Sequence, residues 1–563
     1  MVEATVESTQ MEHNLSSESK SIQSFVPGVK EKPQDNLQRH DTNSSHLSHL
    51  SHLSVVSSNH MLERHYTQQS AVEDELLIHY VPSPTFDEIS KGRKIMLVIS
   101  MALTQLLSQA VMSQTVVPSN FIAKSFGVAD DAGEISWMTA AYSLSMGTFI
   151  LISGRFGDLL GYKFVYVSSY IVLCLFSLLA GISYYSGSVE FFDICRAFQG
   201  LAFSASVPNA LGILGHYFPD GPEKNMAFAV FAGVAPGGFV IGALFDALFA
   251  QLTNWRWIFY VTCIVSLCVA FTSFMVIPSK IGSRPKKIEF SMFDPWGSVT
   301  CVTGLVLVNF ALNHGPVVGW ETVYVYVLLI VGVLFLVLCG FIERKARFPL
   351  VPPLNTEVLF TLSCIALGWS SFGIWLFYTF KFAYEVLNLP IAVAAVQFIP
   401  AAFSGMCAGI TTAKVLPLVP TSLVMLVSMC CFEGGILLSG LRPRGQIYWA
   451  QKFPSMIIAA CGMDSSFPSG IMILSNALPK RHQGLAASLV NVVVNYSISI
   501  GLGIAGTVEY YTAKHGHSPF EVIRDAFYTG MGLSGCGIVV ALIFCSYQFY
   551  RSHHQKNVFN EVA

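Results

Sequence analysis

The sequence predicts an all-α membrane protein with about 14 transmembrane helices. Apolar stretches of about 18 to 25 residues recur between Ile95 and Phe549, and about 20 residues of helix cross the hydrocarbon core of a bilayer. Of the 563 residues, 53% are hydrophobic and only 12% are charged, about half the charged share of a soluble domain. Because backbone groups in lipid have no water to bind, each stretch is expected to be helical.

The expected helices follow the apolar stretches, with ends that are approximate by several residues. They cover residues 95–116, 135–153, 164–183, 191–216, 226–250, 257–278, 296–313, 323–342, 359–380, 391–411, 420–440, 448–475, 484–507 and 528–549. The polar segments at the two ends, 1–90 and 551–563, are predicted to be tails outside the membrane, and the first is too polar to fold alone.

Lys and Arg in the short loops indicate the orientation of the chain. Residues such as Lys163, Arg344 and Lys345 fall in alternate loops, which places both tails in the cytoplasm. Arg442 and Arg444 lie on the opposite side and run against this rule, which leaves open one misplaced helix in the second half.

Composition excludes several classes of function. A net charge of -2 lacks the excess of basic residues that is typical of nucleic-acid-binding proteins. The 13 cysteines lie in or beside apolar stretches without metal-ligand spacing, and no metal or cofactor is expected. A membrane-embedded enzyme would need clustered His, Asp or Glu at one membrane face, and the apolar stretches contain no such cluster in the sequence.

The segment between the second and third stretches is the most specific motif. It contains Gly154, Arg155, Asp158, Gly161 and Lys163, with glycines suited to a tight turn and an acid placed to face a helix end. This spacing resembles the loop signature of the major facilitator superfamily, in which it acts in gating. Tyr162 stands where that family usually has a basic residue.

A glycine-rich segment in the fifth stretch agrees with this resemblance. Glycines at four-residue spacing let helices approach closely, and an included proline adds a bend. The segment resembles the helix-packing motif of proton-driven antiporters in the superfamily. Its members here are Gly233, Pro236, Gly237, Gly238 and Gly242.

The count of 14 stretches points to the larger drug:proton antiporter subgroup. Within it, residues of about 95–550 resemble the fungal aminotriazole-resistance and boron-efflux proteins and their low-affinity ammonium-transporter relative. The resemblance implies an N-terminal six-helix bundle (91–280), a linker with two extra helices (281–350) and a C-terminal six-helix bundle (351–550). Many members carry an Asp in the first helix, but this chain has Gln109 there, so proton coupling would need other groups.

Ionisable residues in apolar stretches are the candidates for that coupling. Arg196 occupies a position that the resembled family associates with proton coupling, and a structural ion pair is the alternative. Asp464, Glu433 and Asp246 are acids in apolar surroundings, and Asp464, next to Ser465 and Ser466, is the preferred carrier. The candidates for the lining of a substrate cavity are Gln109, Gln199, Asn491 and Asn495.

These observations predict a transporter that exports a small solute or toxicant, of the drug, aminotriazole or boron class, by proton antiport with alternating access. A facilitator or importer of ammonium or another small solute is the first alternative, and a transporter-like nutrient sensor the second. The expected partners are a small molecule, protons and the lipid bilayer. The protein is expected to be a monomer in the plasma membrane, with the vacuolar membrane as the alternative.

Overall fold

The computed structural model describes residues 90–129, 131–218, 222–278, 294–345, 355–416, 418–477 and 483–562. Within these ranges the chain is helical and contains no strand, which confirms the predicted fold class. In this part of the chain, 13 helices are long and apolar enough to cross a membrane, and a bent pair brings the number to 14. The predicted tail 1–90 lies almost wholly outside the described residues.

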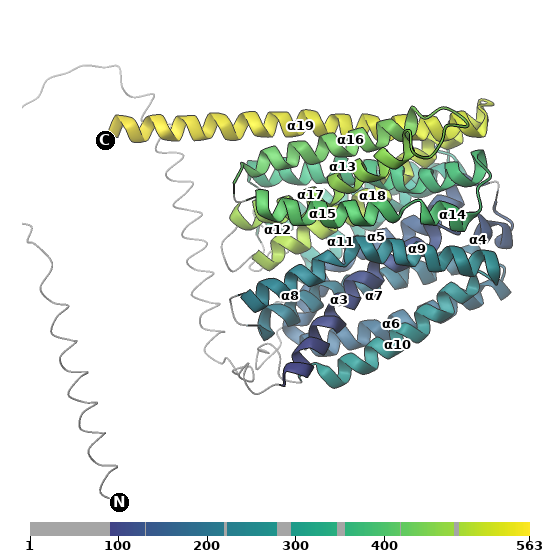
Figure 1. The fold of residues 1–563 in the computed structure, drawn as a ribbon, viewed down its shortest axis with the longest axis horizontal. Coiled ribbons are helices and arrows are strands. Elements are labelled where there is room, and N and C mark those ends of the chain that lie inside the picture. Colours follow the sequence, from purple (N-terminus) through teal and green to yellow (C-terminus); the bar gives the residue numbers. More distant parts are fainter. Residues whose placement is uncertain are drawn as a thin grey trace, which may run out of the picture. The chain divides into compact units, whose positions relative to one another are not determined.

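The helices divide along the chain into two sets with a pair between them (Figure 1). The N-terminal set comprises α3 (Lys91–Val116), α4 (Ser119–Phe126), α5 (Ala132–Leu160), α6 (Tyr162–Ile182), α7 (Val189–Tyr217), α8 (Pro222–Gly233), α9 (Ala235–Leu252) and α10 (Arg256–Val276). The pair is α11 (Pro295–Val318) and α12 (Val323–Glu343). The C-terminal set comprises α13 (Thr356–Lys381), α14 (Ile391–Val396), α15 (Ile399–Val415), α16 (Thr421–Gly440), α17 (Lys452–Ala477), α18 (Gln483–Lys514) and α19 (Pro519–Val562).

The two sets meet along two seams. In the first seam α5 packs against α18, and in the second α9 packs against α14 and α15. Within the N-terminal set α7 packs against α5 and α6, and within the C-terminal set α16 packs against α17 and α19. Each seam therefore joins helices that are far apart in the sequence.

Two predicted helices are broken at prolines. The fifth stretch is divided into α8 and α9 at Val234, and Pro236 stands in the first turn of α9. The tenth stretch is divided into α14 and α15, and Pro400 stands in the first turn of α15. Proline lacks the N–H that would continue a helix, so a break or bend at each of these points is expected.

The second predicted helix is longer than the sequence indicated. It was expected to end at residue 153, but α5 continues to Leu160 after a bend of 52° between Ile150 and Ile152. Only Gly161 separates α5 from α6, and its φ of 97° is a conformation that favours glycine. The predicted loop motif is therefore mostly the last turns of α5, because the short polar segment between the two apolar stretches did not end the helix.

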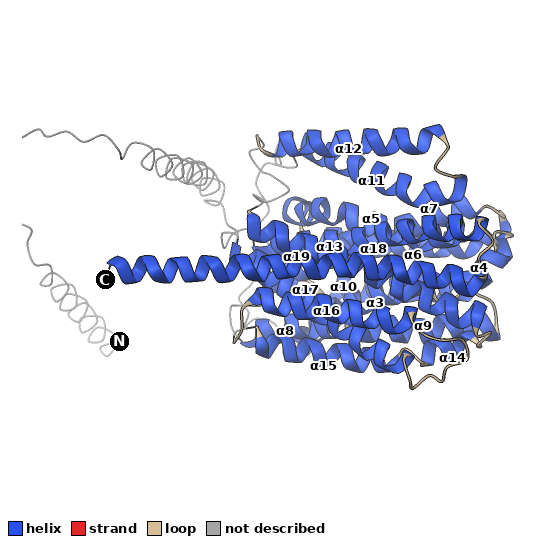
Figure 2. Cartoon of the chain, turned by 90° about the horizontal axis from the view of Figure 1, so that it is seen from above, coloured by secondary structure: helices blue, strands red, loops and turns tan. Residues whose placement is uncertain are grey.

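The pair α11 and α12 differs in how deeply each helix is embedded (Figure 2). α12 packs against α11 and is the least buried of the candidate spans in the described chain. α11 also packs against α5 and α18, at the first seam. α11 is thus part of the contact between the sets, and more than a connecting segment.

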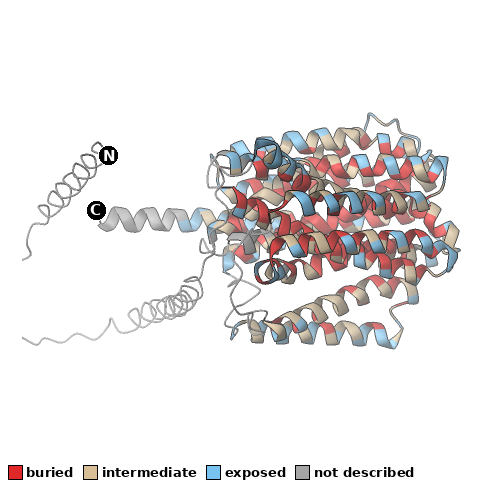
Figure 3. Cartoon of the chain, turned by 90° about the horizontal axis from the view of Figure 1, so that it is seen from below, coloured by how far each residue is buried: buried red, intermediate tan, exposed pale blue. Residues whose placement is uncertain are grey.

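Exposed residues lie along the outward faces of the helices (Figure 3), and many of the exposed residues are large and apolar. Leu252, Phe271 and Leu334 are examples of such exposed side chains on α9, α10 and α12. A water-soluble protein rarely exposes continuous apolar surface of this extent. The surface is therefore suited to lipid.

Candidate functional site

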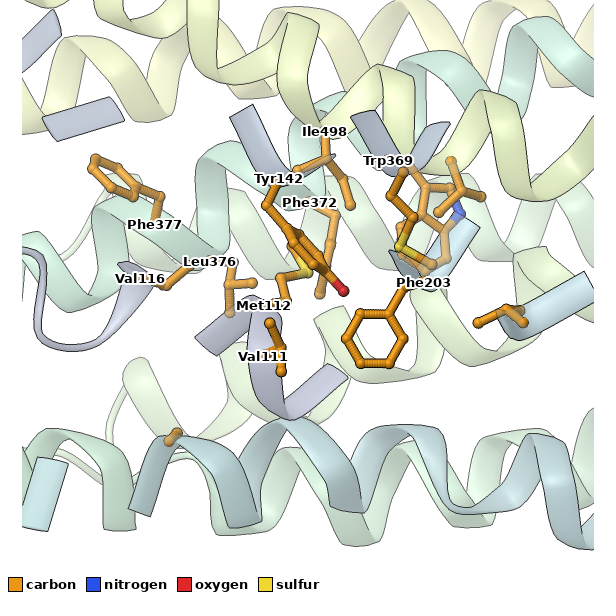
Figure 4. Close-up of a cluster of buried hydrophobic side chains, with 14 of the residues drawn as sticks. Val111, Met112, Val116, Tyr142, Phe203, Trp369, Phe372, Leu376, Phe377 and Ile498 are labelled. Atoms are coloured by element: carbon orange, nitrogen blue, oxygen red, sulfur yellow. The ribbon is translucent and has the colours of Figure 1, made fainter. Parts of the chain in front are cut away.

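The centre of the molecule is filled by apolar and aromatic side chains from both sets (Figure 4). The N-terminal set contributes Val111, Met112, Val116, Tyr142 and Phe203, and the C-terminal set contributes Trp369, Phe372, Leu376, Phe377 and Ile498. All of these side chains are buried in one cluster. An apolar, aromatic interior of this kind favours contact with an organic solute over contact with a strongly hydrated ion.

Arg196 lies on α7 beside this cluster and is fully buried. Its Nη1 donates to Gln114 at 3.3 Å and to Gln199 at 2.6 Å, and its Nη2 donates to the Val111 carbonyl at 3.0 Å and to Thr115 at 3.3 Å. These partners are all neutral. The guanidinium is therefore held mainly by α3, with its charge uncompensated at hydrogen-bond distance.

Aromatic and amide groups complete the surroundings of this arginine. The guanidinium carbon lies 4.9 Å from the centre of the Tyr142 ring, a favourable cation–π distance. Gln199 also donates to Ser177 at 2.8 Å, so its amide is committed to helix contacts. Gln199, predicted as a cavity residue, thus serves here as a partner of Arg196.

Two buried acids flank the same part of the N-terminal set. Asp246 on α9 accepts a short hydrogen bond from Ser113 of α3. Asp193 on α7 is buried, and its Oδ1 has no hydrogen-bond partner. Consecutive residues of α3, Ser113 and Gln114, therefore bind an acid from α9 and Arg196 from α7, a convergence that sequence analysis did not reveal.

Asp464 lies on α17 at the second seam. Its Oδ2 is buried and has no hydrogen-bond partner. A Cβ atom added to Gly405 of α15 would lie 2.0 Å from this oxygen and 3.4 Å from the Cβ of Pro236 on α9. The carboxylate is therefore packed over the bare backbone of Gly405, where both sets meet.

The two serines that follow Asp464 do not bind it, contrary to expectation. Ser465 accepts a hydrogen bond from Thr412 of α15 at 2.9 Å. Ser466 accepts one from the indole of Trp369 on α13 at 3.1 Å and donates to the carbonyl of Met463. Neighbouring residues on a helix point in different directions, which explains the difference.

Glu433, the other predicted acid of the C-terminal set, lies on α16 and is half-buried. Its Oε2 accepts a hydrogen bond from Ser534 of α19 at 2.5 Å. This contact joins two neighbouring helices of one set. It lies away from both seams, in contrast to Asp464.

The residues of the predicted gating motif occupy the end of α5 and the start of α6. Asp158 accepts a hydrogen bond from Tyr162, and Arg155 is one of the cations near it. Lys163 donates to the carbonyl of Ile277 at 2.7 Å, beyond the end of α10. A Cβ on Gly154 would meet open space, so packing does not require glycine at that position.

Only part of the predicted glycine motif makes close helix contact. A Cβ on Gly238 would lie 2.4 Å from the carbonyl oxygen of Leu106, and one on Gly242 would lie 2.6 Å from the Cα of Ala110. Both contacts are with α3. A Cβ on Gly233 or Gly237 would have no atom within 4 Å.

The remaining cavity candidates lie at different places. Gln109 is half-buried on α3. Asn495 donates to the carbonyl of Asn491 in its own helix at 3.0 Å, and it packs on Gly147 of α5 at the first seam. The described structure therefore does not gather these four residues around one point.

Polar residues of α11 fasten the first seam and were not predicted from the sequence. Ser499 of α18 donates to Asn309 at 2.8 Å and to the carbonyl of Ala140 on α5 at 3.3 Å. Asn313 donates to Asn309 at 2.7 Å and to Ser499 at 3.3 Å. The four-residue spacing of the two asparagines on one helix was the available signal.

A buried ion pair near the end of α13 was also missed. Lys381 contacts Glu509 of α18, and Tyr378 donates to the same carboxylate at 2.8 Å. Nearby, Lys124 of α4 donates to the hydroxyl of Tyr384 at 2.8 Å, which links the two sets at this end. Lys381 and Glu509 are far apart in the sequence, so no local pattern indicates this pair.

Among the described residues, no group of three or more His, Cys, Asp or Glu side chains could hold a metal ion.

Comparison with protein families gives one match, to the Major Facilitator Superfamily, over residues 96–503. The chain is 48% identical to the low affinity ammonium transporter of Saccharomyces cerevisiae, over 80% of this chain and 88% of the relative. It is 37% identical to the efflux pump terJ of Aspergillus terreus, over 83% of this chain and 91% of the relative. It is 35% identical to the aminotriazole resistance protein of Saccharomyces cerevisiae, over 81% of this chain and 84% of the relative.

Solved structures share the fold at low sequence identity. A POT family transporter in complex with a thioalcohol-conjugated peptide aligns with a TM-score of 0.62 and 13% identity, over 83% of this chain and 98% of the other. The nucleoside transporter NupG aligns with a TM-score of 0.56 and 14% identity, over 80% of this chain and 99% of the other. The fold is thus that of known transporters.

Proposed function

Because the chain belongs to the major facilitator superfamily, we propose that it exports a small organic solute in exchange for protons, with Asp464 as the proton carrier. The relatives named as efflux pumps or resistance proteins support export. The apolar interior supports an organic solute of the drug or aminotriazole class. The expected setting is a monomer in the plasma membrane with both tails in the cytoplasm.

The arrangement of the helices supports alternating access. We propose that α3–α10 and α13–α19 act as two six-helix bundles that rock about the central cluster, with the solute bound between them. Tyr142 and Phe203 on one side and Trp369 and Phe372 on the other are positioned to contact an apolar solute. Movement at the second seam would open and close the space between the bundles.

The buried, unpartnered oxygen of Asp464 is the observation on which the proton role rests. Burying an ionised carboxylate without a hydrogen bond is costly, so closure of the seam over Gly405 favours the protonated form. Opening of α9 away from α15 would expose the carboxyl to water and favour release of the proton. Protonation would in this way be coupled to the position of the seam.

Arg196 is assigned a supporting role in this proposal. Its charge is held by neutral groups of α3, and Asp246 is bound to the same stretch of that helix. A shift of α3 would therefore alter the surroundings of both charges together. Gln109 takes no part in proton transfer, because its amide side chain is neutral and does not ionise.

The decisive experiment compares Asp464→Asn with Asp464→Glu in reconstituted vesicles. Aminotriazole efflux is measured against an imposed pH gradient. We expect Asp464→Asn to lose the dependence on the gradient, because Asn imitates only the neutral carboxyl, and Asp464→Glu to keep part of it. Asp525→Asn is the matched control, since Asp525 binds His517 at 2.8 Å near the surface.

One result would contradict the assignment, and another would invalidate the assay. Full gradient-driven efflux in Asp464→Asn would make its carboxyl structural, and Glu433 or Arg196 would become the next candidate. Loss of the gradient dependence in Asp525→Asn as well would show that the assay reports general damage to the protein.

A second candidate function is low-affinity uptake of ammonium. The 48% identity to a relative of that name favours it, and so does the amide at Gln109 in place of an acid. Uptake of radiolabelled methylammonium into the same vesicles tests it. Uptake that is independent of the pH gradient, without aminotriazole efflux, would favour this second function.

A further inference from the structure

A small cavity lies at the end of the C-terminal set, apart from the central cluster and from Asp464. It is lined by Thr379, Phe382, Ser439, Arg442, Lys452 and Phe527, from the ends of α13 and α16, the start of α17 and α19. Its volume of about 10 Å³ is room for one water-sized occupant. Its size excludes the transported solute.

Two buried basic side chains face this cavity. Lys452 is only 3% exposed, and its Nζ has no hydrogen-bond partner. Arg442 is 7% exposed; its Nη2 donates to the carbonyl of Gln446 at 3.0 Å, whereas its Nε has no partner. The lining therefore presents two positive groups with unused donors.

The remaining lining supplies no negative charge. None of the six lining residues is acidic, and the nearby buried carboxylate, Glu509, is bound to Lys381 and Tyr378. The hydroxyl of Thr379 has no partner either. Phe382 and Phe398 lie beside the cations, at 5.3 Å from the Arg442 guanidinium and 5.9 Å from the Lys452 ammonium.

Burying two positive charges without a counter-ion is unfavourable, and an anion between them would offset this cost. The first turn of α17 adds to the positive potential, because Lys452 is the first residue of that helix. We propose that this cavity binds a single chloride ion between Lys452 and Arg442, with the Thr379 hydroxyl as a further donor.

This site is independent of which solute the protein transports. It would fix the start of α17 against α13 and α16, so its effect should appear as stability of the folded protein. The Trp375 indole donates to Ser439 and Ser455 beside the cavity, which couples the site to the core of the C-terminal set.

The test uses the purified full-length protein in lipid nanodiscs. Its melting temperature is followed by intrinsic fluorescence as sodium chloride or sodium bromide replaces sodium gluconate at constant ionic strength. We expect a saturable rise in melting temperature with either halide. The rise should be lost in Lys452→Gln and reduced in Arg442→Gln.

Arg444→Gln is the matched control. Arg444 is an exposed neighbour that donates to Ser518 at 3.0 Å and lies 4.3 Å from the Phe520 ring, outside the lining. It should keep the full halide response. An equal response in Lys452→Gln would overturn the proposal, because the effect would then be general to halide salts.

A direct measurement covers the case in which Lys452→Gln does not fold. The NMR line width of chloride is measured with the wild-type protein, and bromide is added as a competitor. Broadening that bromide reverses supports the site. Absence of any halide binding by the wild-type protein would overturn it, leaving Lys452 uncharged or bound to water.

Discussion

The hydroxyl of Tyr162 donates a hydrogen bond to the carboxylate of Asp158 across the one-residue break between α5 and α6. Tyr162 is the residue at which the motif departs from its family pattern. The tyrosine binds the acid of the motif directly. The acid is thereby fixed at the end of α5 next to Arg155 and His216.

We predict that Asp158→Asn impairs transport without preventing membrane insertion. The substitution keeps the shape of the side chain and removes its charge. The carboxylate lies near Arg155 and His216, and a partly exposed charge contact of this kind contributes on the order of 1 kcal/mol. That is enough to shift a balanced equilibrium between inward and outward states several-fold. Initial transport rates and the amount of protein in the membrane are the two measurements.

Tyr162→Phe is the companion variant, because it removes the hydrogen bond and keeps the charge. A hydrogen bond of this kind contributes about 1 kcal/mol. We expect a smaller loss of transport than in Asp158→Asn. Wild-type rates in both variants would show that the motif has no role in this protein.

We predict that Gly238→Leu abolishes transport, because its Cβ would meet the backbone of Leu106. Gly238→Ala should already destabilise the folded protein by about 1–3 kcal/mol, as overpacking does. Gly237→Ala is the control on the same helix, since its Cβ would have no atom within 4 Å. Thermal unfolding in detergent and vesicle transport should separate the two alanine variants.

We predict that Glu509→Gln destabilises the protein by about 3–5 kcal/mol, because it leaves the buried ammonium of Lys381 without its counter-ion. The double variant Lys381→Met/Glu509→Leu should recover much of this loss, since neither charge remains buried. The measurement is the free energy of unfolding of all three proteins. Equal stability of Glu509→Gln and the wild type would mean that the pair is hydrated.

We predict that both termini lie in the cytoplasm. The prediction rests on the basic residues of alternate loops and on an even number of spans. Reporters fused to each end should report the same compartment. Opposite compartments would show that one span, such as the bent α5, does not cross the membrane.

The sequence was sufficient to predict where the helices lie along the chain, because each helix is a long apolar stretch. It was insufficient where a polar break was expected to end a helix, as at Gly154, since the backbone of α5 continues through it. Proline breaks were predictable only in part: the bend at Pro236 was expected, and the division at Pro400 was not.

The candidate site was less accessible to sequence analysis. Asp464 and Arg196 could be selected because charges in apolar stretches are unusual. Asp464 contacts Gly405, and Arg196 is hydrogen-bonded to α3, only because particular helices pack together. Such tertiary neighbours leave no periodic pattern in a single chain.

The polar cluster of α11 makes the two seams unequal. Ser499 and Asn309 fasten the first seam by hydrogen bonds, whereas the second is closed by Pro236 over Gly405 and by the rings of Phe239 and Phe398, whose centres are 6.3 Å apart. Hydrogen bonds buried in a lipid environment resist separation more than apolar contacts do. The two sets of helices should therefore rotate relative to each other about an axis along α5 and α18. Opening at α9 and α15 would then give an apolar solute a lateral route of entry from the bilayer.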